Sequence, residues 1–203
     1  MMSSRAEAGA ATRERIIATA RKLFTERGFE GTSTESVLEE SSVSRGALYH
    51  HFENKRALFA AVLDAVEADI ARQTRKAGAA FGDPVDALCA GFDVFLGLAS
   101  SNPEVRQVVL IDAHSAVGWE TWREIDERHG FGRIKDALKK AAALGYLAEG
   151  MVDTYSHMLL ASVIEVAFLI ARTPPAETTL EKGRTAMREM VNRLLTPGRA
   201  GKD

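Results

Sequence analysis

The recurrence of apolar residues at helical spacing constrains this chain most, because it excludes a sheet. Ile16, Ile17, Ala20, Leu23 and Phe24 fall on one stripe of an amphipathic helix. A second stripe runs through Leu58, Phe59, Val62, Leu63, Val66 and Ile70. No sustained alternation of apolar and polar residues is bounded by turn signals, which is the pattern of strands. The sequence therefore predicts an all-α fold.

Glycine and proline divide the rest of the chain into further helices. Thr12 is expected to cap the first helix and Gly28 to end it. The later segments are expected at about 34–41, 45–51, 84–101, 103–113, 118–130, 131–144, 152–172 and up to 195. The segment 152–172 is apolar nearly all round, which is typical of a helix buried on more than one side.

Charge and cysteine content narrow the function classes. A net charge of −2 over 203 residues argues, as an average, against a nucleic-acid partner. The single cysteine, Cys89, forms no intrachain disulfide, and residues 1–15 lack an apolar signal core, so we expect a cytoplasmic protein. The most apolar stretch, 158–171, is interrupted by Ser162 and Glu165 and is shorter than the ~18 residues of a membrane span, so no membrane partner is expected.

The most informative block runs from residue 32 to 52. It reads as two helices of two turns each with a short connection, capped by Ser33 or Thr34 and by Ser44. The outward face of the second helix combines small residues near its N-terminus with a cation, a phenol and an imidazole. Such a face suits entry into a DNA major groove, with close approach to base edges and donors for phosphates. A surface helix pair without a ligand explains the same pattern equally well.

This block resembles the DNA-binding domain of TetR-type transcriptional regulators. The matching residues are Gly28-Phe29, Thr32, Thr34, the run from Val43 to Phe52, Lys55 and Leu58. Ser42 stands where that family usually has a turn glycine, and Leu38 where it usually has alanine. Since serine disfavours a positive φ, we expect the angle between the two helices to differ slightly.

The resemblance implies a domain order and a set of DNA contacts. It implies a three-helix helix-turn-helix domain over 12–60 and a larger helical domain for ligand binding and dimerisation over 61–196. The composition of the ends separately predicts a flexible arm over 1–11 and a flexible tail over 197–203. Phosphate contacts are implied for Thr34, Ser44, Tyr49, His50 and Lys55, and proximity to base edges for Arg45, Gly46 and Ala47. Arg45 is the best candidate to bind a guanine, because its planar fork matches O6 and N7. Leu48 and Phe52 are expected in the core, and His51 is ambiguous.

The charge balance changes when the chain is divided. Residues 1–60 hold nine lysines and arginines against eight acids, and residues 41–56 hold three cations against one acid. The predicted DNA-binding face is therefore locally positive in a chain that is acidic elsewhere. We expect a modest salt dependence and poor binding to random DNA.

The resemblance also implies an effector pocket in the middle helices and a dimer formed by the last two. Two antiparallel apolar helices, doubled by symmetry, make a four-helix bundle. The expected interface is Leu159, Val163, Val166, Met187, Met190, Val191 and Leu194. The alternative is that both helices pack only on their own core.

Aromatic residues suggest a largely apolar small-molecule effector. The candidate pocket consists of Phe92, Phe95, Trp119, Trp122 and Phe168, with Asp112 and His114 as orienting polar groups. A phenylalanine at helical spacing is more often core than pocket wall, and Asp112 with His114 is equally explained as a surface or capping pair.

The leading hypothesis is a homodimeric repressor that binds a pseudo-palindromic operator and is released by its effector. An activator, or a DNA binder that needs no effector, would share the fold. An enzyme is disfavoured, since nucleophile-elbow, zinc-protease, P-loop and dinucleotide motifs are missing. The five histidines show no metal-ligand spacing, so neither cofactor nor metal is expected.

Overall fold

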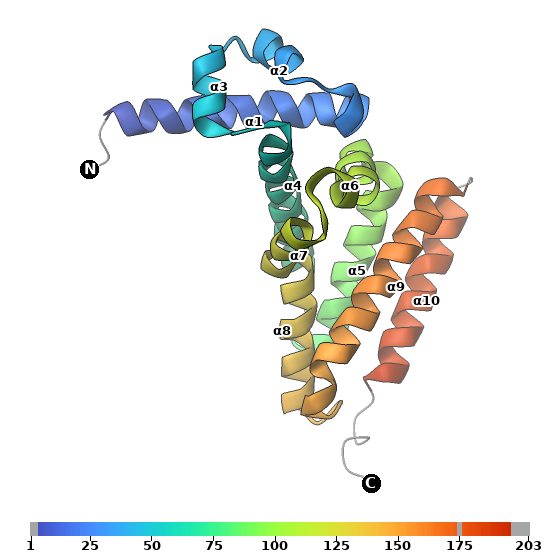
Figure 1. Ribbon diagram of the computed structural model, residues 1–203. Helices are drawn as coiled ribbons and strands as arrows, with labels where there is room; N and C mark the ends of the chain where they lie inside the picture. The colour runs from blue at the N-terminus through green and yellow to red at the C-terminus, as the bar shows by residue number, and fades with distance from the viewer. Residues whose placement is uncertain (1–3, 174–175, 196–203) are drawn as a thin grey trace. The chain divides into compact units, whose positions relative to one another are not determined.

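The computed structural model describes residues 4–173 and 176–195, and within those residues it contains helices and no strand. The bounds are α1 Ser4–Gly31, α2 Thr34–Ser41, α3 Arg45–His51, α4 Lys55–Gly78, α5 Pro84–Ser101, the π-helix η1 Val105–Asp112, α6 Ala113–Val117, α7 Trp119–Arg128, α8 Gly130–Ala143, the 3₁₀ turn η2 Glu149–Met151, α9 Val152–Arg172 and α10 Ala176–Leu194 (Figure 1). The all-α prediction is confirmed. The expected tail at 197–203 lies outside the described residues.

The chain forms two compact units. The N-terminal unit comprises Met1–Val66 together with Pro103–Arg123, and the C-terminal unit comprises Glu67–Asn102 together with Glu124–Asp203. The boundary expected near residue 60 stays a prediction. The packing of Pro103–Arg123 with the first helices was not predictable from apolar periodicity.

Helix α1 begins earlier than predicted and is kinked near its end. It starts at Ser4, so the expected cap Thr12 is wrong: this residue lies inside the helix and donates a hydrogen bond to the Ala8 carbonyl. Gly28 has φ 70° and ψ 175°, a conformation that glycine adopts without the penalty of a Cβ. Gly28 was expected to end the helix; it breaks the helical backbone there, but α1 continues to Gly31.

Three aromatic rings form the centre of the N-terminal unit. Phe24 and Phe29 from the end of α1 pack edge-on against Phe59 of α4, with ring centroids 5.0 Å and 5.2 Å from Phe59. Edge-to-face packing of this kind adds to the gain from burial. Leu48 of α3 and Val37 of α2 are also buried, so α1–α4 share one core.

The segment from residue 103 attaches to α1 through its π-helix. Glu104, just before η1, pairs with Arg21 of α1 at 2.8 Å between Oε2 and Nη2. At the other end of η1, Asp112 Oδ2 accepts hydrogen bonds from the Phe29 backbone N–H at 2.7 Å and from Gln107 Nε2 at 3.0 Å. The sequence predicted a single helix at 103–113, because apolar spacing does not distinguish an α-helix from a π-helix.

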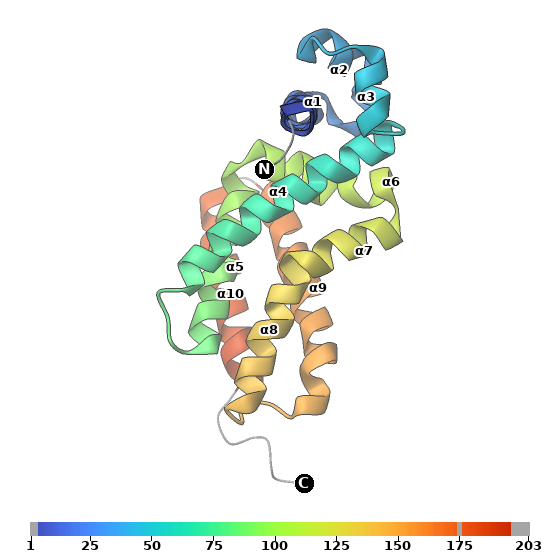
Figure 2. The same ribbon diagram turned by 90° about the vertical axis from the view of Figure 1, so that its left-hand side faces the viewer.

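Helices α5, α8, α9 and α10 pack together in the C-terminal unit (Figures 1 and 2). The predicted segments 84–101 and 152–172 match α5 and α9. Gly183 of α10 lies against Val166 and Ile170 of α9, and a Cβ there would come within 2.8 Å of Val166 Cγ1. Glycine therefore permits the close approach of α9 and α10.

Two helical stretches, Pro84–Ser101 and Glu149–Arg172, are long and apolar enough to cross a membrane by length and composition alone. The second extends beyond the 158–171 stretch on which the sequence expectation rested. Both stretches pack into the helix bundle of the C-terminal unit. Of the residues in their most apolar windows, 39% and 33% are buried, respectively.

Candidate nucleic-acid interface

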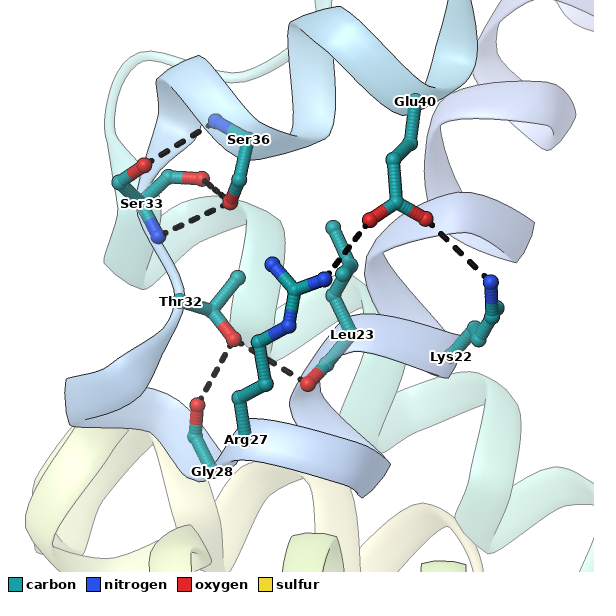
Figure 3. Close-up of polar contacts among 8 residues, drawn as sticks. All are labelled: Lys22, Leu23, Arg27, Gly28, Thr32, Ser33, Ser36 and Glu40. Carbon is teal, nitrogen blue, oxygen red and sulfur yellow. Dashed lines mark hydrogen bonds and ion pairs between the residues drawn. The ribbon is translucent and has the colours of Figure 1, made fainter.

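Helix α2 is fastened to α1 by one carboxylate. Glu40 Oε1 lies 2.9 Å from Arg27 Nη2, and Glu40 Oε2 lies 3.4 Å from Lys22 Nζ (Figure 3). Both cations project from α1 and are partly exposed, so each pair stabilises only modestly and mainly sets the orientation of α2. The sequence analysis did not predict these ion pairs, because Arg27 and Lys22 lie 13 and 18 residues before Glu40.

Hydroxyl groups fix the connection from α1 to α2. The buried Thr32 Oγ1 lies 2.9 Å from the Gly28 carbonyl oxygen and 3.2 Å from that of Leu23. Its hydroxyl therefore donates a hydrogen bond to the carbonyl groups near the end of α1. Ser33 Oγ accepts from the Ser36 N–H at 3.0 Å, and Ser36 Oγ accepts from the Ser33 N–H at 3.2 Å (Figure 3). This reciprocal arrangement is a capping box at the start of α2, and the predicted cap at Ser33 is confirmed.

The turn between α2 and α3 uses a serine in a glycine-like conformation. Ser42 has φ 53° and ψ 36°, the left-handed region in which a Cβ is unfavourable. Glycine usually stands here in the resembled family, and the expected difference in the angle between the two helices stays a prediction. Two residues later, Ser44 Oγ accepts from the Ala47 N–H at 3.2 Å, which confirms Ser44 as the N-cap of α3.

Helix α3 buries one side and exposes the other. Leu48 and the following Phe52 are in the core, as expected, and His51 is half-buried. Ala47 is half-buried as well, whereas the other α3 and cap residues predicted to contact DNA are exposed: Ser44, Arg45, Gly46, Tyr49 and His50. The exposed side therefore carries the residue types that the sequence analysis assigned to DNA, although their contacts with DNA stay a prediction.

Gly46 has no structural reason to be glycine within the described protein. It is the second residue of α3, and a Cβ built there meets nothing within 4 Å. Glycine in the middle of a helix costs about 0.5–1 kcal/mol relative to alanine, and in this first turn the cost is at most that. A surface from another molecule that approaches the backbone closely would explain why that cost is tolerated.

The remaining predicted DNA contacts, Thr34 and Lys55, lie beside α3. Thr34 Oγ1 is 3.5 Å from the Tyr49 hydroxyl, so the structure brings these two together. Lys55 Nζ donates to the Phe29 carbonyl at 2.8 Å and lies 4.2 Å from the Phe29 ring centroid. One of its three N–H groups is thus used inside the unit, and two remain for a phosphate.

A carboxylate that the sequence analysis did not select lies among these donors. Glu35, in the first turn of α2, accepts from Arg45 Nη2 at 3.3 Å and from Thr34 Oγ1 at 3.1 Å. Hydrogen bonds from its own backbone and from Thr34 lower the pKa of Glu35, and the charge of Arg45 lowers it further. No sequence signal pairs residues 35 and 45, because their approach depends on the turn between α2 and α3.

Four of the seven predicted effector-pocket residues belong to the N-terminal unit, and three of those four form a cluster. The His114 ring lies 4.0 Å from Trp122 and 6.0 Å from Trp119, centroid to centroid, and the Arg123 guanidinium lies 5.0 Å and 4.9 Å from the two indole rings. Burial, followed by the charge of Arg123, lowers the pKa of His114. Trp119 remains 60% exposed, whereas Trp122 is buried.

Asp112, the fourth of these residues, caps the kink of α1. Its carboxylate accepts the Phe29 N–H and the Gln107 side chain, which supports the alternative capping interpretation. A role for Asp112 in orienting an effector stays a prediction.

The other three predicted pocket residues lie in the C-terminal unit. Phe92 is buried, Phe95 and Phe168 are half-buried, and Arg172 lies over the Phe168 ring at 4.7 Å. A separate open groove of about 680 Å³ lies between the start of α9 and the end of α10. Tyr146, Met151 and Tyr155 line one side of it and Glu189, Met190 and Arg193 the other, so it contains none of the predicted pocket residues.

Burial separates the predicted dimer residues into two groups. Leu159, Val163, Met187 and Val191 are at most 3% exposed and pack inside the protomer, so they offer no surface to a partner. Val166, Met190 and Leu194 are half-buried. Periodicity identified the apolar positions of both helices but not which side each one faces. Met158 and Leu169, absent from the prediction, are 53% and 54% exposed on α9.

The described residues hold no cluster of three or more histidine, cysteine or acidic side chains that could bind a metal ion. His50 and His51 are adjacent, with ring centroids 5.2 Å apart.

Two family models match this chain. One, described as "Bacterial regulatory proteins, tetR family", matches residues 16–62, which span the α1–α4 interface described above. The other, described as "Tetracyclin repressor-like, C-terminal domain", matches residues 85–194, more than half of the chain.

Individual proteins show the same likeness. The transcriptional regulator UidR of Escherichia coli K12 is 35% identical over 77 residues, which cover 38% of this chain and 36% of UidR, so the chain matches about a third of that relative's length. A TetR-family regulator from Pectobacterium atrosepticum superposes with a TM-score of 0.77 at 29% identity, over 97% of this chain and 100% of that one. SmeT of Stenotrophomonas maltophilia, described as the repressor of a multidrug efflux pump and also solved with triclosan, shares the fold with a TM-score of 0.67 at 24% identity, over 94% and 96% of the two chains.

Proposed function

Because this chain belongs to the TetR family of bacterial transcriptional regulators, we propose that it is a repressor that binds a pseudo-palindromic operator as a homodimer and is released by a small-molecule effector. The family resemblance predicted from residues 28–58 is confirmed by the matched models. The matched family and relatives are transcriptional regulators rather than enzymes. A cytoplasmic location accords with that role.

The exposed side of α3 carries this proposal. Its N-terminal turn presents a backbone without a side chain at Gly46 and an exposed guanidinium at Arg45. Close approach of the backbone at Gly46 lets neighbouring side chains reach base edges. Arg45, Gly46 and Ala47 then lie at base edges, with Arg45 bound to guanine.

Phosphates are assigned to the donors around α3. Ser44, Tyr49 and His50 are exposed on it, and Thr34 lies within 3.5 Å of Tyr49. Lys55 contributes the two N–H groups that Phe29 does not use. These contacts set the register of the protein on DNA without specifying sequence.

The homodimer is assigned to the exposed side of α9 with the adjoining part of α10. Met158 and Leu169 present apolar side chains to solvent, and Val166, Met190 and Leu194 are half-buried. A two-fold axis would pair these surfaces into a four-helix bundle and place two α3 helices on one operator.

An aromatic effector is assigned to the cluster of His114, Trp119 and Trp122. The cluster follows directly on η1, whose Asp112 holds the kinked end of α1. A ligand that displaces these rings would act on η1 and so on the placement of α1 and α3. The triclosan complex of SmeT, a protein of the same fold, accords with an apolar aromatic ligand.

Selection of duplexes from a random DNA pool tests the proposal. The full-length protein should enrich sites with two related half-sites, and Arg45→Ala should weaken binding to them by about 1–3 kcal/mol if Arg45 contacts a base. Lys140→Ala, which removes a cation from exposed α8 surface, is the matched control and should leave the affinity unchanged. Failure to enrich any sequence at low salt would refute the proposal.

A further inference from the structure

The Glu35 carboxylate lies in a hydrogen-bond network with three of the side chains assigned to DNA, two of which bond to it directly. Its Oε1 accepts from Arg45 Nη2 at 3.3 Å, and its Oε2 accepts from Thr34 Oγ1 at 3.1 Å. The Tyr49 hydroxyl lies 3.5 Å from the same Thr34 oxygen. The contacts join the first turn of α2 to two turns of α3, and Glu35 and Arg45 are both exposed where DNA is expected.

The hydrogen atoms of this network can be assigned one by one. Thr34 has a single hydroxyl hydrogen, which Glu35 receives, so Tyr49 must be the donor in its contact with Thr34. Arg45 has five N–H groups and gives one to Glu35. Four of them therefore remain available to another acceptor while the Glu35 contact is kept.

The carboxylate is ionised at neutral pH, since its hydrogen bonds lower the pKa of Glu35 from an already acidic value. A carboxylate and a phosphate offer the same kind of acceptor to a guanidinium. Glu35 thus competes with the DNA backbone for Arg45 and disfavours a phosphate placed against that guanidinium.

We propose that Glu35 is a specificity-determining residue. It keeps the Arg45 guanidinium available to a guanine and makes binding of that guanidinium to a backbone phosphate unfavourable. This inference rests on the proposed function of α3 in DNA binding. On an operator, Arg45 keeps its contact with Glu35 and turns its remaining N–H groups to O6 and N7 of the base. On random DNA, Arg45 must turn to a phosphate, which breaks the contact and leaves the Glu35 charge beside the backbone.

The test compares Glu35→Gln with wild type on two probes: a duplex that the wild-type protein enriches, and an unselected random duplex. Glutamine keeps an acceptor for Arg45 but removes the charge. Affinity for the random duplex should rise about two- to fivefold, the range of one exposed ion pair, while affinity for the selected duplex changes less. The salt dependence on random DNA should steepen by about 0.9 in the logarithmic slope, as for one more neutralised phosphate.

Glu39→Gln is the matched control. Glu39 lies one turn further along α2, is exposed, and makes no contact with Arg45 in the described part of the chain. It should leave the ratio of selected to random affinity unchanged. An equal fall of that ratio in Glu35→Gln and Glu39→Gln, or no fall in either, would overturn the inference.

A double-mutant cycle tests whether Glu35 acts through Arg45. In the Arg45→Ala background, Glu35→Gln should have no larger effect than Glu39→Gln. A full effect in that background would show that Glu35 acts by another route. If the wild-type protein enriches no duplex, the proposed function itself fails, and that outcome is distinct from a failure of the Glu35 variants alone.

Discussion

Single residues determine the orientation of α2 relative to α3, and Ser42 is the clearest case. It is the one non-glycine residue with a positive φ in the described chain, and it sits in the turn that sets the two helices against each other. The left-handed conformation costs a residue with a Cβ about 1–2 kcal/mol, and glycine avoids that cost. The turn is thus formed at the expense of stability.

Ser42→Gly should stabilise the protein. The relief of strain, less the larger entropy of glycine in the unfolded chain, predicts a gain of about 0.5–1 kcal/mol in the free energy of unfolding. Urea denaturation followed by circular dichroism measures it. Ser42→Ala keeps a Cβ and is the control, so an equal gain in the alanine variant would show that strain at φ is not the cause.

The residues of the site differ in how far sequence could predict them. The caps Ser33 and Ser44 were predictable because each bonds to a backbone N–H three residues away. Glu35 was not, since its partner Arg45 is ten residues distant and is brought near by the turn at Ser42. The hydrogen bond from Lys55 to the Phe29 carbonyl was also not predictable from the sequence, because the two residues are 26 positions apart.

Among the elements, η1 connects features that the sequence analysis treated separately. Its last residue, Asp112, accepts the Phe29 N–H just after the kink at Gly28. Sequence periodicity located the helices well, as the bounds of α2, α3 and α9 show. It did not predict the π-helical bonding of η1, which changes hydrogen-bond partners rather than the pattern of apolar residues.

Asp112→Ala should loosen this connection. Loss of a charge-assisted hydrogen bond to a half-buried carboxylate is expected to lower the free energy of unfolding by about 1.5–3 kcal/mol. Asp112→Asn, which keeps an acceptor, should cost less, and both are measured by urea denaturation. Asp136→Ala, which breaks an exposed ion pair with Lys139, serves as control and should change stability little. A loss in Asp136→Ala as large as in Asp112→Ala would contradict the assignment.

At the scale of the whole molecule, burial shows which apolar residues pack in the core of the protomer and which remain on its surface. Leu159, Val163, Met187 and Val191 fill its core, and Met158 and Leu169 remain on its surface. Helical spacing alone could not separate these groups, because α9 is apolar on nearly every side. The exposed group is the surface to which a homodimer is assigned.

Leu169→Glu should dissociate the proposed dimer. A two-fold axis would bury both new carboxylates without partners, so the free energy of association should weaken by about 2 kcal/mol or more. Sedimentation equilibrium of the full-length protein measures the change. Leu144→Glu alters a leucine that is 59% exposed after α8 and should leave the association intact. A dimer unaffected by Leu169→Glu would place the interface elsewhere.

The N-terminal unit is built from two separate segments of the chain, and this limits how DNA specificity can be exchanged between regulators. Arg21 and Phe29 bond to Glu104 and Asp112, which are 83 residues further along the chain. A chimaera that grafts only the first sixty or so residues onto another regulator would lose both partners. A transplant that carries Pro103–Arg123 as well keeps them, so recombination at a single crossover is a poor route to new operator preferences in this protein.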